Sequence, residues 1–368
     1  MNILKKAATK TLLSFTLATT LFFTSNISGS IAHAGVGEIT YVIPEPNFQD
    51  FSHIEKDYNN DLSDKTVILT TNDVHGAIDG YPYLAGMKKY FGELGADVLV
   101  VDSGDFSQTK PENEDGTKKS PDEIFVTPSN GLAIDCMNSV GYDIVALGNH
   151  EGTSIKKLES KLEKTPKKFD IVDANVLKKI KKDNQTYYEP YFLENTSRTF
   201  GEGESQVTIG FFGLDTSEAK GSGTKVLTGE DMATCAQEQY DKLKGKGADI
   251  VICLSHLGLE KALADKGEAS FSIYEKVNQI DLMIDGHSHS IITPSEGKEP
   301  ILSTGTEFQN IGVVIIDNKE KKITDTFLIP NNVFTSFAPI SPANNDAAAA
   351  TAKDVERVKK ESQSGSKK

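Results

Sequence analysis

The stretch "DIVALGNHEG", residues 143–152, changes character abruptly in its middle. Its first half, Ile144–Leu147 with Asp143 before it, has the unbroken apolar run of a buried β-strand. A glycine follows, and then Asn149, His150 and Glu151 stand in a row. A buried strand that runs into an amide, an imidazole and a carboxylate indicates that these polar groups serve a site rather than the core.

The same change from apolar strand to polar turn occurs five times along the chain. The five runs are "TVILTT" (66–71), "ADVLVVDS" (96–103), "YDIVAL" (142–147), "ADIVICLS" (248–255) and "IDLMID" (280–285). Helical patterns lie between them, such as "SNGLAIDCMNSVG" (129–141) and "GEDMATCAQEQYDKLKGKG" (229–247). Alternating strands and helices predict an α/β fold with many parallel strands. Because ligands bind at the carboxyl ends of such strands, the five turns are expected to face one site.

The histidines gather in these turns. The chain has seven, and five of them stand at the strand ends: His75, His150, His256, His287 and His289. Asp73, Asp105 and Asn149 occur in the same turns. Imidazoles and carboxylates together suit divalent metals, and a carboxylate can bridge two ions about 3.5–4 Å apart. Five histidines and these three residues are too many ligands for one ion, so the pattern predicts two.

Five motifs in order carry a resemblance to a known family. "NDVHG" (72–76), "SGD" (103–105), "GNHE" (148–151), "SHLG" (255–258) and "DGHSH" (285–289) together resemble the calcineurin-like metallophosphoesterases. The opening "ILTTNDVHG" and the pairing of "CLSHLGL" with "IDLMIDGHSH" are similar to its branch of 5′-nucleotidases and 2′,3′-cyclic phosphodiesterases. The resemblance covers residues 66 to about 328. It implies a four-layer αββα sandwich with the metal site at the carboxyl ends of the strands.

The resemblance also implies a role for each candidate residue. One metal is bound by Asp73, His75 and His289, the other by Asn149, His256 and His287, and Asp105 bridges them. The ions are divalent, with Mn, Zn, Fe and similar metals all left open. A water or hydroxide held at the metals attacks phosphorus in line, since metal binding lowers its pKa towards neutrality. His150 matches the family's catalytic histidine, which contacts the phosphate and assists the leaving group, and Glu151 is expected to orient neighbouring groups.

Two features depart from the nucleotidase pattern. Those enzymes usually have GNHEFD, in which the aspartate orients the catalytic histidine, whereas here Gly152 and Thr153 follow Glu151. They also carry a further domain whose aromatic residues stack the base and whose arginines hold phosphate. After residue 34 this sequence has two arginines, Arg198 and Arg357, and no tryptophan. A nucleotide pocket of the usual kind is therefore not expected.

The ends of the chain differ in composition from its middle. Residues 1–34 combine a basic start, the apolar run "TLLSFTLATTLFF" and small residues up to Ala34. This pattern predicts a signal peptide that is cleaved near Ala34 and a secreted, periplasmic or cell-surface protein. An uncleaved anchor is the alternative, although a membrane span needs about 20 apolar residues. We expect an irregular arm over 35–63, a metallophosphoesterase domain over 64–330 and a largely disordered tail over 331–368. Within that tail, "AAAATAKDVERVKK" leaves room for a short helix.

Net charge and the distribution of apolar runs limit the classes of partner that the chain can bind. The net charge of −14 argues against a nucleic acid duplex, because phosphate backbones recruit Lys and Arg. A small phosphate ester remains compatible, since bound cations reverse the local field. Beyond the leader no apolar run is long enough to span a membrane, and a partner domain or chain stays open.

A disulfide between Cys136 and Cys235 is compatible with the sequence but not required, and Cys253 lies in an apolar run.

Two further segments carry less specific patterns. The basic run "KKIKKDNQ" (178–185) is more typical of a solvated loop or helix end than of a binding patch. The tyrosines that follow it are compatible with packing in the core, with a place on the surface, or with stacking on the leaving group of a substrate. "TSRTFGEGESQ" (196–206) predicts a hairpin before the strand "VTIGFFGL".

Three functions remain in competition at this point. The first is a secreted two-metal phosphoesterase acting on phosphomonoesters or phosphodiesters, nucleotides included. The second is a non-catalytic binding protein on the same fold, which the change at Thr153 suggests. The third is a hydrolase of another anionic ester, such as a sulfur-containing substrate.

Overall fold

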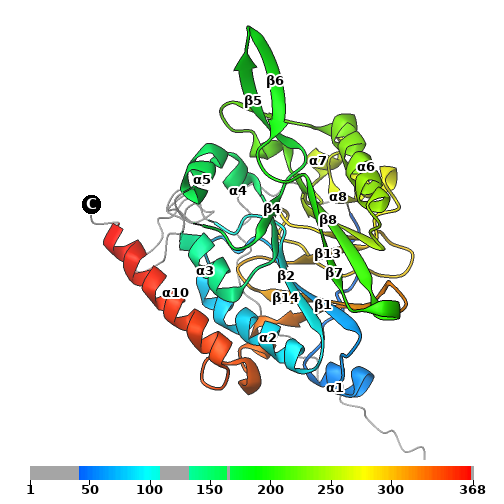
Figure 1. Ribbon diagram of the computed structural model, residues 1–368, viewed down its shortest axis with the longest axis vertical. Coiled ribbons are helices and arrows are strands. Elements are labelled where there is room, and N and C mark those ends of the chain that lie inside the picture. The colour runs from blue at the N-terminus through cyan, green and yellow to red at the C-terminus, as the bar shows by residue number, and fades with distance from the viewer. Residues whose placement is uncertain (1–40, 108–131, 164–165, 366–368) are drawn as a thin grey trace, which may run out of the picture.

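The computed structural model describes residues 41–107, 132–163 and 166–365. Two six-stranded sheets pack face to face, and helices cover the outer face of each. Figure 1 shows these layers together with a hairpin that projects from one end of the molecule. The predicted four-layer α/β sandwich is therefore confirmed.

The first sheet contains the first three of the predicted strands. Its spatial order is β15 (Lys322–Pro330), β14 (Asn310–Asp317), β1 (Lys65–Thr71), β2 (Asp97–Asp102), β3 (Ile144–Ala146) and β4 (Asp170–Val172). The four strands from β1 to β4 run parallel, and β14 and β15 are antiparallel additions at one edge. The turns after β1, β2 and β3 consequently open at the same end of the sheet.

The second sheet contains the other two predicted strands. Its order is β12 (Ile291–Ile292), β13 (Ile301–Thr304), β11 (Leu282–Ile284), β10 (Ile250–His256), β8 (Val207–Asp215) and β7 (Asn195–Phe200). β8, β10, β11 and β13 are parallel. β7 and β8 form an antiparallel hairpin, so the strand "VTIGFFGL" is itself one arm of the hairpin that the sequence around residue 200 predicts before it.

The strands are apolar throughout because both of their faces are buried. In β1, Ile68 points between the two sheets, whereas its neighbours Val67 and Leu69 pack under the outer helices. Ile252 and Ile284 meet Ile68 in the layer between the sheets. Alternate residues thus enter different cores, which explains why the strands lack a polar face.

Helices on the first sheet are α2 (Tyr81–Glu93), α3 (Leu132–Val140) and α10 (Asp346–Gly365). Helices on the second sheet are α6 (Gly229–Gly245) and α8 (Ser270–Lys276). Short helices at the strand ends and connections are α1 (Ser52–Tyr58), α4 (Asn149–Gly152), α5 (Ile155–Leu162), α7 (Lys261–Ala264) and α9 (Asn331–Phe334). A separate three-stranded sheet consists of β6 (Gln185–Pro190), β5 (Val176–Lys182) and β9 (Thr224–Val226).

The expectation of a largely disordered tail over 331–368 is wrong for residues 331–365. α10 lies across α2 and α3 (Figure 1) and buries Ala348, Thr351, Val355 and Val358 completely or almost completely. These residues recur every three or four positions and form one apolar stripe. The sequence shows this stripe only weakly, because two of its four members are Ala and Thr. In the structure these small side chains let the helices approach closely.

The expectation of an irregular arm over 35–63 is wrong for the second half of that segment. α1 packs on the first sheet and buries Ile54, and the Phe51 ring stacks on Phe337 at 3.8 Å between centroids. Residues 1–40, with the predicted signal peptide, lie outside the described residues.

Cys136, Cys235 and Cys253 are free and buried, so the optional disulfide is not formed. Cys136 belongs to α3 on the first sheet and Cys235 to α6 on the second, which places both sheets between them. None of the helices in residues 41–107, 132–163 and 166–365 combines the length and apolarity needed to cross a membrane.

Candidate metal centre

All eight candidate residues lie at the carboxyl ends of the parallel strands, where the two sheets meet. Asp73 and His75 follow β1, Asp105 follows β2, and Asn149 and His150 lie in α4 directly after β3. From the second sheet, His256 ends β10, and His287 and His289 follow β11. Both sheets therefore contribute to one cluster, as the five turns predict.

Five of the seven candidate metal ligands have left-handed backbone conformations. The φ angles are 48° for Asp73, 47° for His75, 54° for Asp105, 74° for His287 and 51° for His289. Each such non-glycine residue costs on the order of 1–3 kcal/mol and persists only where the surroundings hold it. Here the Asp73 and His75 N–H groups donate to the Gly104 and Asp105 carbonyls, both at 2.9 Å. The turns are thus fixed in conformations that point side chains inward.

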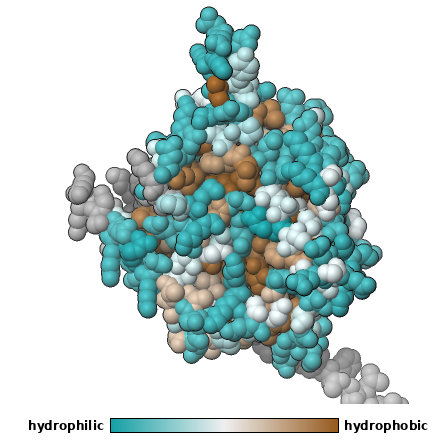
Figure 2. Space-filling model, in the orientation of Figure 1, coloured by the Kyte–Doolittle hydropathy of each residue, from teal (hydrophilic) through white to brown (hydrophobic). Residues whose placement is uncertain are grey.

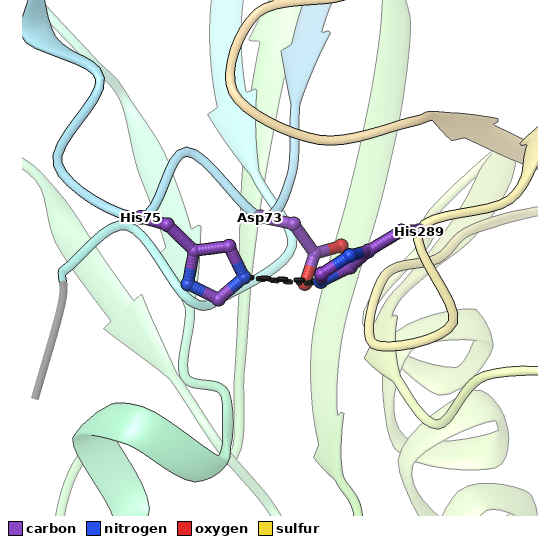
Figure 3. Close-up of side chains that lie close together, drawn as sticks. All are labelled: Asp73, His75 and His289. Carbon is purple, nitrogen blue, oxygen red and sulfur yellow. Dashed lines mark hydrogen bonds and ion pairs between the residues drawn. The ribbon is translucent and has the colours of Figure 1, made fainter. Parts of the chain in front are cut away.

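Asp73, His75 and His289 form the first group of converging side chains (Figure 3). The Nε2 atoms of His75 and His289 are 3.1 Å apart. Asp73 Oδ1 lies 3.6 Å from the His75 nitrogen and 3.5 Å from the His289 nitrogen. Three ligand atoms that point at a common centre from these distances match the residues of the first expected metal.

Asp105 and His256 are the centre of a second group. His256 Nε2 lies 3.1 Å from Asp105 Oδ2 and 3.8 Å from Asp73 Oδ1. Asn149 Oδ1 is 3.1 Å from His287 Nδ1, and the His256 and His287 rings are 5.3 Å apart. The residues expected for the second metal are therefore neighbours as well.

Both buried aspartates connect the two groups. Asp105 clusters with His75 and His150 on one side and with Asp73 and His256 on the other. Asp73 Oδ1 likewise approaches histidines of both groups. A carboxylate between two sets of ligands is the arrangement that a bridging ligand requires.

The electrostatics of the cluster are those of closely packed opposite charges. Burial by itself raises the pKa of Asp73 and Asp105, but the nearby histidines hold the pKa of both carboxyls well below the usual value. Burial favours neutral His256, yet Asp105 and Asp73 raise its pKa well above the usual value. Burial, with His256 nearby, lowers the pKa of His287 to about 4. Positive charge at the position between the carboxylates is strongly favoured.

His256 provides the clearest test of whether a cation fits this position. Its Nδ1 lies 2.8 Å from the Ser103 carbonyl and donates to it, which leaves Nε2 as the inward-facing nitrogen. That nitrogen is buried, and the atoms that face it are carboxylate oxygens, Asp105 Oδ2 at 3.1 Å and Asp73 Oδ1 at 3.8 Å. A histidine whose second nitrogen donates to a backbone carbonyl is the usual form of a metal ligand. The donor set therefore fits a divalent ion.

His150 stands at the rim of the cluster and is partly exposed. Its Nε2 lies 3.9 Å from Asp105 Oδ2, and its backbone N–H donates to Asp105 Oδ1 at 2.9 Å. Its Nδ1 lies 3.2 Å from the Ser107 carbonyl oxygen, which orients the ring. No sequence pattern indicates this contact, because a backbone carbonyl can come from any residue.

Thr153 does not take over the role of the aspartate in the nucleotidase pattern. Its hydroxyl donates to the Asn149 carbonyl at 2.9 Å and lies 3.5 Å from the His150 carbonyl. These are contacts within the turn of α4, and the imidazole of His150 is not among them. The Ser107 carbonyl therefore holds the ring that an aspartate would otherwise orient.

Glu151 orients its surroundings as expected. Its buried carboxylate accepts hydrogen bonds from the backbone N–H groups of Asp105 (2.9 Å), Ser107 (3.0 Å) and Gly148 (3.1 Å), and from the Ser107 hydroxyl. Burial and the neighbouring Asp105 raise its pKa to about 7. One side chain thus ties the turn after β2 to the turn after β3.

Asn72 is a positioning residue that the sequence patterns did not single out. Its amide donates to Asp73 Oδ2 at 2.7 Å and to the Gly305 carbonyl at 2.8 Å. Its Oδ1 accepts the Thr304 N–H at 2.8 Å. Asn72 therefore fixes the Asp73 carboxylate against the end of β13, and its place beside Asp73 in "NDVHG" was the available signal.

Comparison with known proteins agrees with this geometry. The family model described as calcineurin-like phosphoesterase matches residues 66–290, which include all eight candidate residues. The chain belongs to this family. The resemblance that the five motifs carry is thereby confirmed.

Two curated relatives come from the nucleotide-acting branch of calcineurin-like phosphoesterases. The chain is 31% identical over 250 residues to the trifunctional nucleotide phosphoesterase protein YfkN of Bacillus subtilis, covering 62% of this chain and 17% of that protein. It is 29% identical over 253 residues to the 2′,3′-cyclic-nucleotide 2′-phosphodiesterase/3′-nucleotidase of Haemophilus influenzae, covering 62% and 37%. The chain thus spans well under half the length of these relatives.

A solved structure supports the fold independently. The calcineurin-like phosphoesterase YfkN from Bacillus subtilis superposes with a TM-score of 0.58 at 21% identity, covering 81% of this chain and 99% of that one. At this identity the similarity establishes the arrangement of sheets and helices. The substrate has to be argued from the site.

Proposed function

We propose that the chain is a secreted phosphoesterase that hydrolyses phosphomonoesters or phosphodiesters, nucleotides among them, with two divalent ions. The observation that carries this proposal is the pair of buried carboxylates between the sheets. Asp73 and Asp105 approach imidazole nitrogens of both sheets at 3.1–3.9 Å. Such a set of oxygen and nitrogen donors suits two neighbouring cations better than one.

The ligands divide between the two ions as follows. Asp73, His75 and His289 hold the first, Asn149, His256 and His287 hold the second, and Asp105 is shared. When bound, the ions supply Lewis acidity to the phosphate oxygens and lower the pKa of a water molecule. The chain supplies rigid placement, since Glu151 and Asn72 hold the turns that carry the two aspartates.

His150 is proposed to act on the leaving group. Its Nδ1 is held by the Ser107 carbonyl, so Nε2 is the nitrogen free to face the substrate at the rim. Nε2 can stabilise a phosphate oxygen or hand a proton to the departing alkoxide. General acid–base help of this kind contributes typically 10²–10⁴-fold.

Nucleotides are included among the substrates because the relatives are named for them. The names of longer relatives describe whole proteins, so the choice between monoester, diester and nucleotide is part of the proposal.

Secretion rests on the leader-like composition of residues 1–34. Sequencing the amino terminus of the chain from culture supernatant should give Gly35 as the first residue. A chain that stays with cells and retains Met1 contradicts this part.

The central experiment is a matrix of metals and substrates on the chain from Gly35. We expect Mn²⁺- or Zn²⁺-loaded protein to release p-nitrophenol from p-nitrophenyl phosphate or its bis ester, and a chelator to abolish release. Absence of turnover with every metal would favour a non-catalytic binding protein. A panel read for both phosphate and sulfate separates the third candidate, because a sulfur-ester hydrolase releases sulfate and leaves phosphate esters intact.

A further inference from the structure

The β5–β6 hairpin, residues 176–190, is a feature that the metal centre does not explain. It projects beyond the rest of the molecule in Figure 1, and Figure 2 shows its surface as mostly hydrophilic. Every residue of β6 is exposed, and β5 is buried only at Val176. We call residues 176–190 the lysine arm. Its outer part contributes little to the core, so its stability does not come from packing there.

The lysine arm has a defined shape despite its exposure. Asp183 and Asn184 join the strands with φ angles of 51° and 59°. Two residues with positive φ form the turn whose twist matches that of paired strands. Lys182 and Gln185 pair directly beside it, and β9 adds a third strand at the base. The arm therefore presents its side chains in a fixed register.

One face of the lysine arm gathers three lysines around a tyrosine. Lys179 pairs across the strands with Tyr188, and Lys181 lies on the same face two residues further along. Lys225 of β9 pairs with Leu177, which shares this face, and its Nζ lies 5.3 Å from the centre of the Tyr188 ring. Tyr188 remains 44% exposed, so part of its ring is open to a ligand.

Two lysines on this face, Lys179 and Lys181, lack acidic partners among the described residues. Lys178, on the other face, is neutralised by Glu159 at 2.7 Å. Lys179 and Lys181 form no ion pair with any residue in the described part of the chain. In a protein with a net charge of −14, this face is a local surface for anions.

The base of the lysine arm borders the metal centre. Residues 173–175 lead from β4 directly into β5. The turn at 217–219 that precedes β9 packs against α4, where a Cβ on Gly152 would lie 2.5 Å from that of Ala219. α4 carries Asn149 and His150. The arm thus rises from the edge of the sandwich at which the candidate ligands lie.

We propose that the lysine arm binds short single-stranded oligonucleotides. Lys179, Lys181 and Lys225 contact successive phosphates, and one base stacks on Tyr188. Lysines beside an exposed aromatic ring are the combination that holds single strands without sequence preference. A duplex hides its bases and brings two charged strands towards an acidic body, so it binds more weakly. This binding goes beyond the proposed function, since it requires no hydrolysis.

The test measures fluorescence anisotropy of a labelled oligothymidylate of about eight nucleotides with the metal-loaded chain from Gly35. Three phosphate contacts predict that affinity falls about 20-fold between about 50 and 200 mM salt. The variant with Lys179→Gln, Lys181→Gln and Lys225→Gln should lose most of the binding and of this salt dependence. Tyr188→Ala should weaken binding by about tenfold, and Tyr188→Phe should retain it. Gel electrophoresis confirms that the probe stays intact.

The matched control changes three exposed lysines elsewhere. Lys266→Gln, Lys353→Gln and Lys360→Gln alter the net charge equally and should leave affinity unchanged. Equal losses in both triple variants, absence of wild-type binding, or equal competition by inorganic polyphosphate of matched charge would each overturn the proposal. Rates on bis-p-nitrophenyl phosphate should be the same in all these variants. Absence of hydrolysis of both p-nitrophenyl phosphate and its bis ester in the wild type counts against the proposed function and leaves the binding result intact.

Discussion

Asp105 contacts groups from both sheets at the candidate metal centre. Its Oδ2 approaches His256 and His150, its Oδ1 accepts the His150 N–H, and its own N–H donates to Glu151. Asn149, in contrast, approaches a single candidate ligand, His287. The two residues therefore allow a comparison between the proposed shared ligand of both ions and a proposed ligand of one ion.

We predict that Asp105→Asn lowers the occupancy of both metals, whereas Asn149→Ala lowers mainly one. The reason is that a neutral amide at position 105 removes the negative charge that both cations share. Elemental analysis after gel filtration should show about two ions per wild-type chain, about one for Asn149→Ala and fewer for Asp105→Asn. Loss of one equivalent in each variant contradicts the shared role of Asp105.

The geometry around His150 gives a second prediction at the scale of one residue. His150→Ala should lower kcat by about 10²–10⁴-fold, and more for alkyl phosphates than for p-nitrophenyl phosphate, because a poor leaving group needs the proton more. Thr153→Ala should stay within about twofold of wild type, since its hydroxyl contacts carbonyls of α4 and leaves the imidazole alone. If Thr153→Ala is as inactive as His150→Ala, this account of the ring's orientation is wrong.

At the scale of elements, α10 makes the largest difference from the sequence-based expectation. Val355 and Val358 are 2% and 0% exposed against α2 and α3. Val358→Ala removes two buried methyl-sized groups and should destabilise the chain by about 2 kcal/mol. Lys353→Ala, on the exposed side of the same helix, should change stability by less than about 0.5 kcal/mol.

Urea unfolding of both variants, and of a chain that ends at Ile340, measures the contribution of α10. The shortened chain should unfold at lower urea than either point variant, because it exposes the whole stripe. A shortened chain with an unchanged midpoint would show that α10 rests on the domain without stabilising it.

The corner between β4 and β5 predicts a pH dependence. Asp173 Oδ1 accepts the N–H groups of Asn175 and Val176, while its buried Oδ2 has no hydrogen-bond partner. Burial raises the pKa of this carboxyl to about 7 from a usual value of 3.8. The folded chain therefore binds the proton more tightly than the unfolded chain, and stability falls as pH rises from about 4 to 7.

Asp173→Asn should remove this fall, because an amide keeps Oδ1 as an acceptor and never ionises. The urea midpoint of Asp173→Asn minus that of the wild type should increase as pH rises from about 4, and this difference should level off above about pH 7. Asp183→Asn, at the exposed turn of the lysine arm, is the control without such a trend. A constant difference between Asp173→Asn and wild type across this range contradicts the raised pKa.

At the scale of the whole molecule, the metal centre connects the two sheets. Asp73 and Asp105 come from the first sheet, and His256, His287 and His289 come from the second. Bound cations should therefore stabilise the sandwich as a unit, by about 2.7 kcal/mol at a free-ion concentration of about 100 times Kd. The thermal midpoint should rise with Mn²⁺ and fall with chelator, and Asp105→Asn should respond less. A thermal midpoint that changes with neither Mn²⁺ nor chelator argues against a metal site that spans the two sheets.

Much of the architecture could be predicted from the sequence because its determinants are local. Unbroken apolar runs such as 98–101 and 250–254 predict buried parallel strands, and the polar residues directly after them predict where ligands lie. The elements that sequence analysis missed have weak local patterns. α10 hides its apolar stripe among Ala and Thr, and α1 is only seven residues long.

The sequence by itself determined the strands, the turn residues and the kind of donor atoms at this site. Only the tertiary structure decided which donors meet, because His75 and His289 are 214 positions apart and come from different sheets. It also decided what holds each group, such as the Ser107 carbonyl on His150 and the Ser103 carbonyl on His256. Backbone carbonyls have no residue-type signature. Their contribution appears only when packing of the two sheets brings the turns together, with five of the candidate ligands held in left-handed conformations.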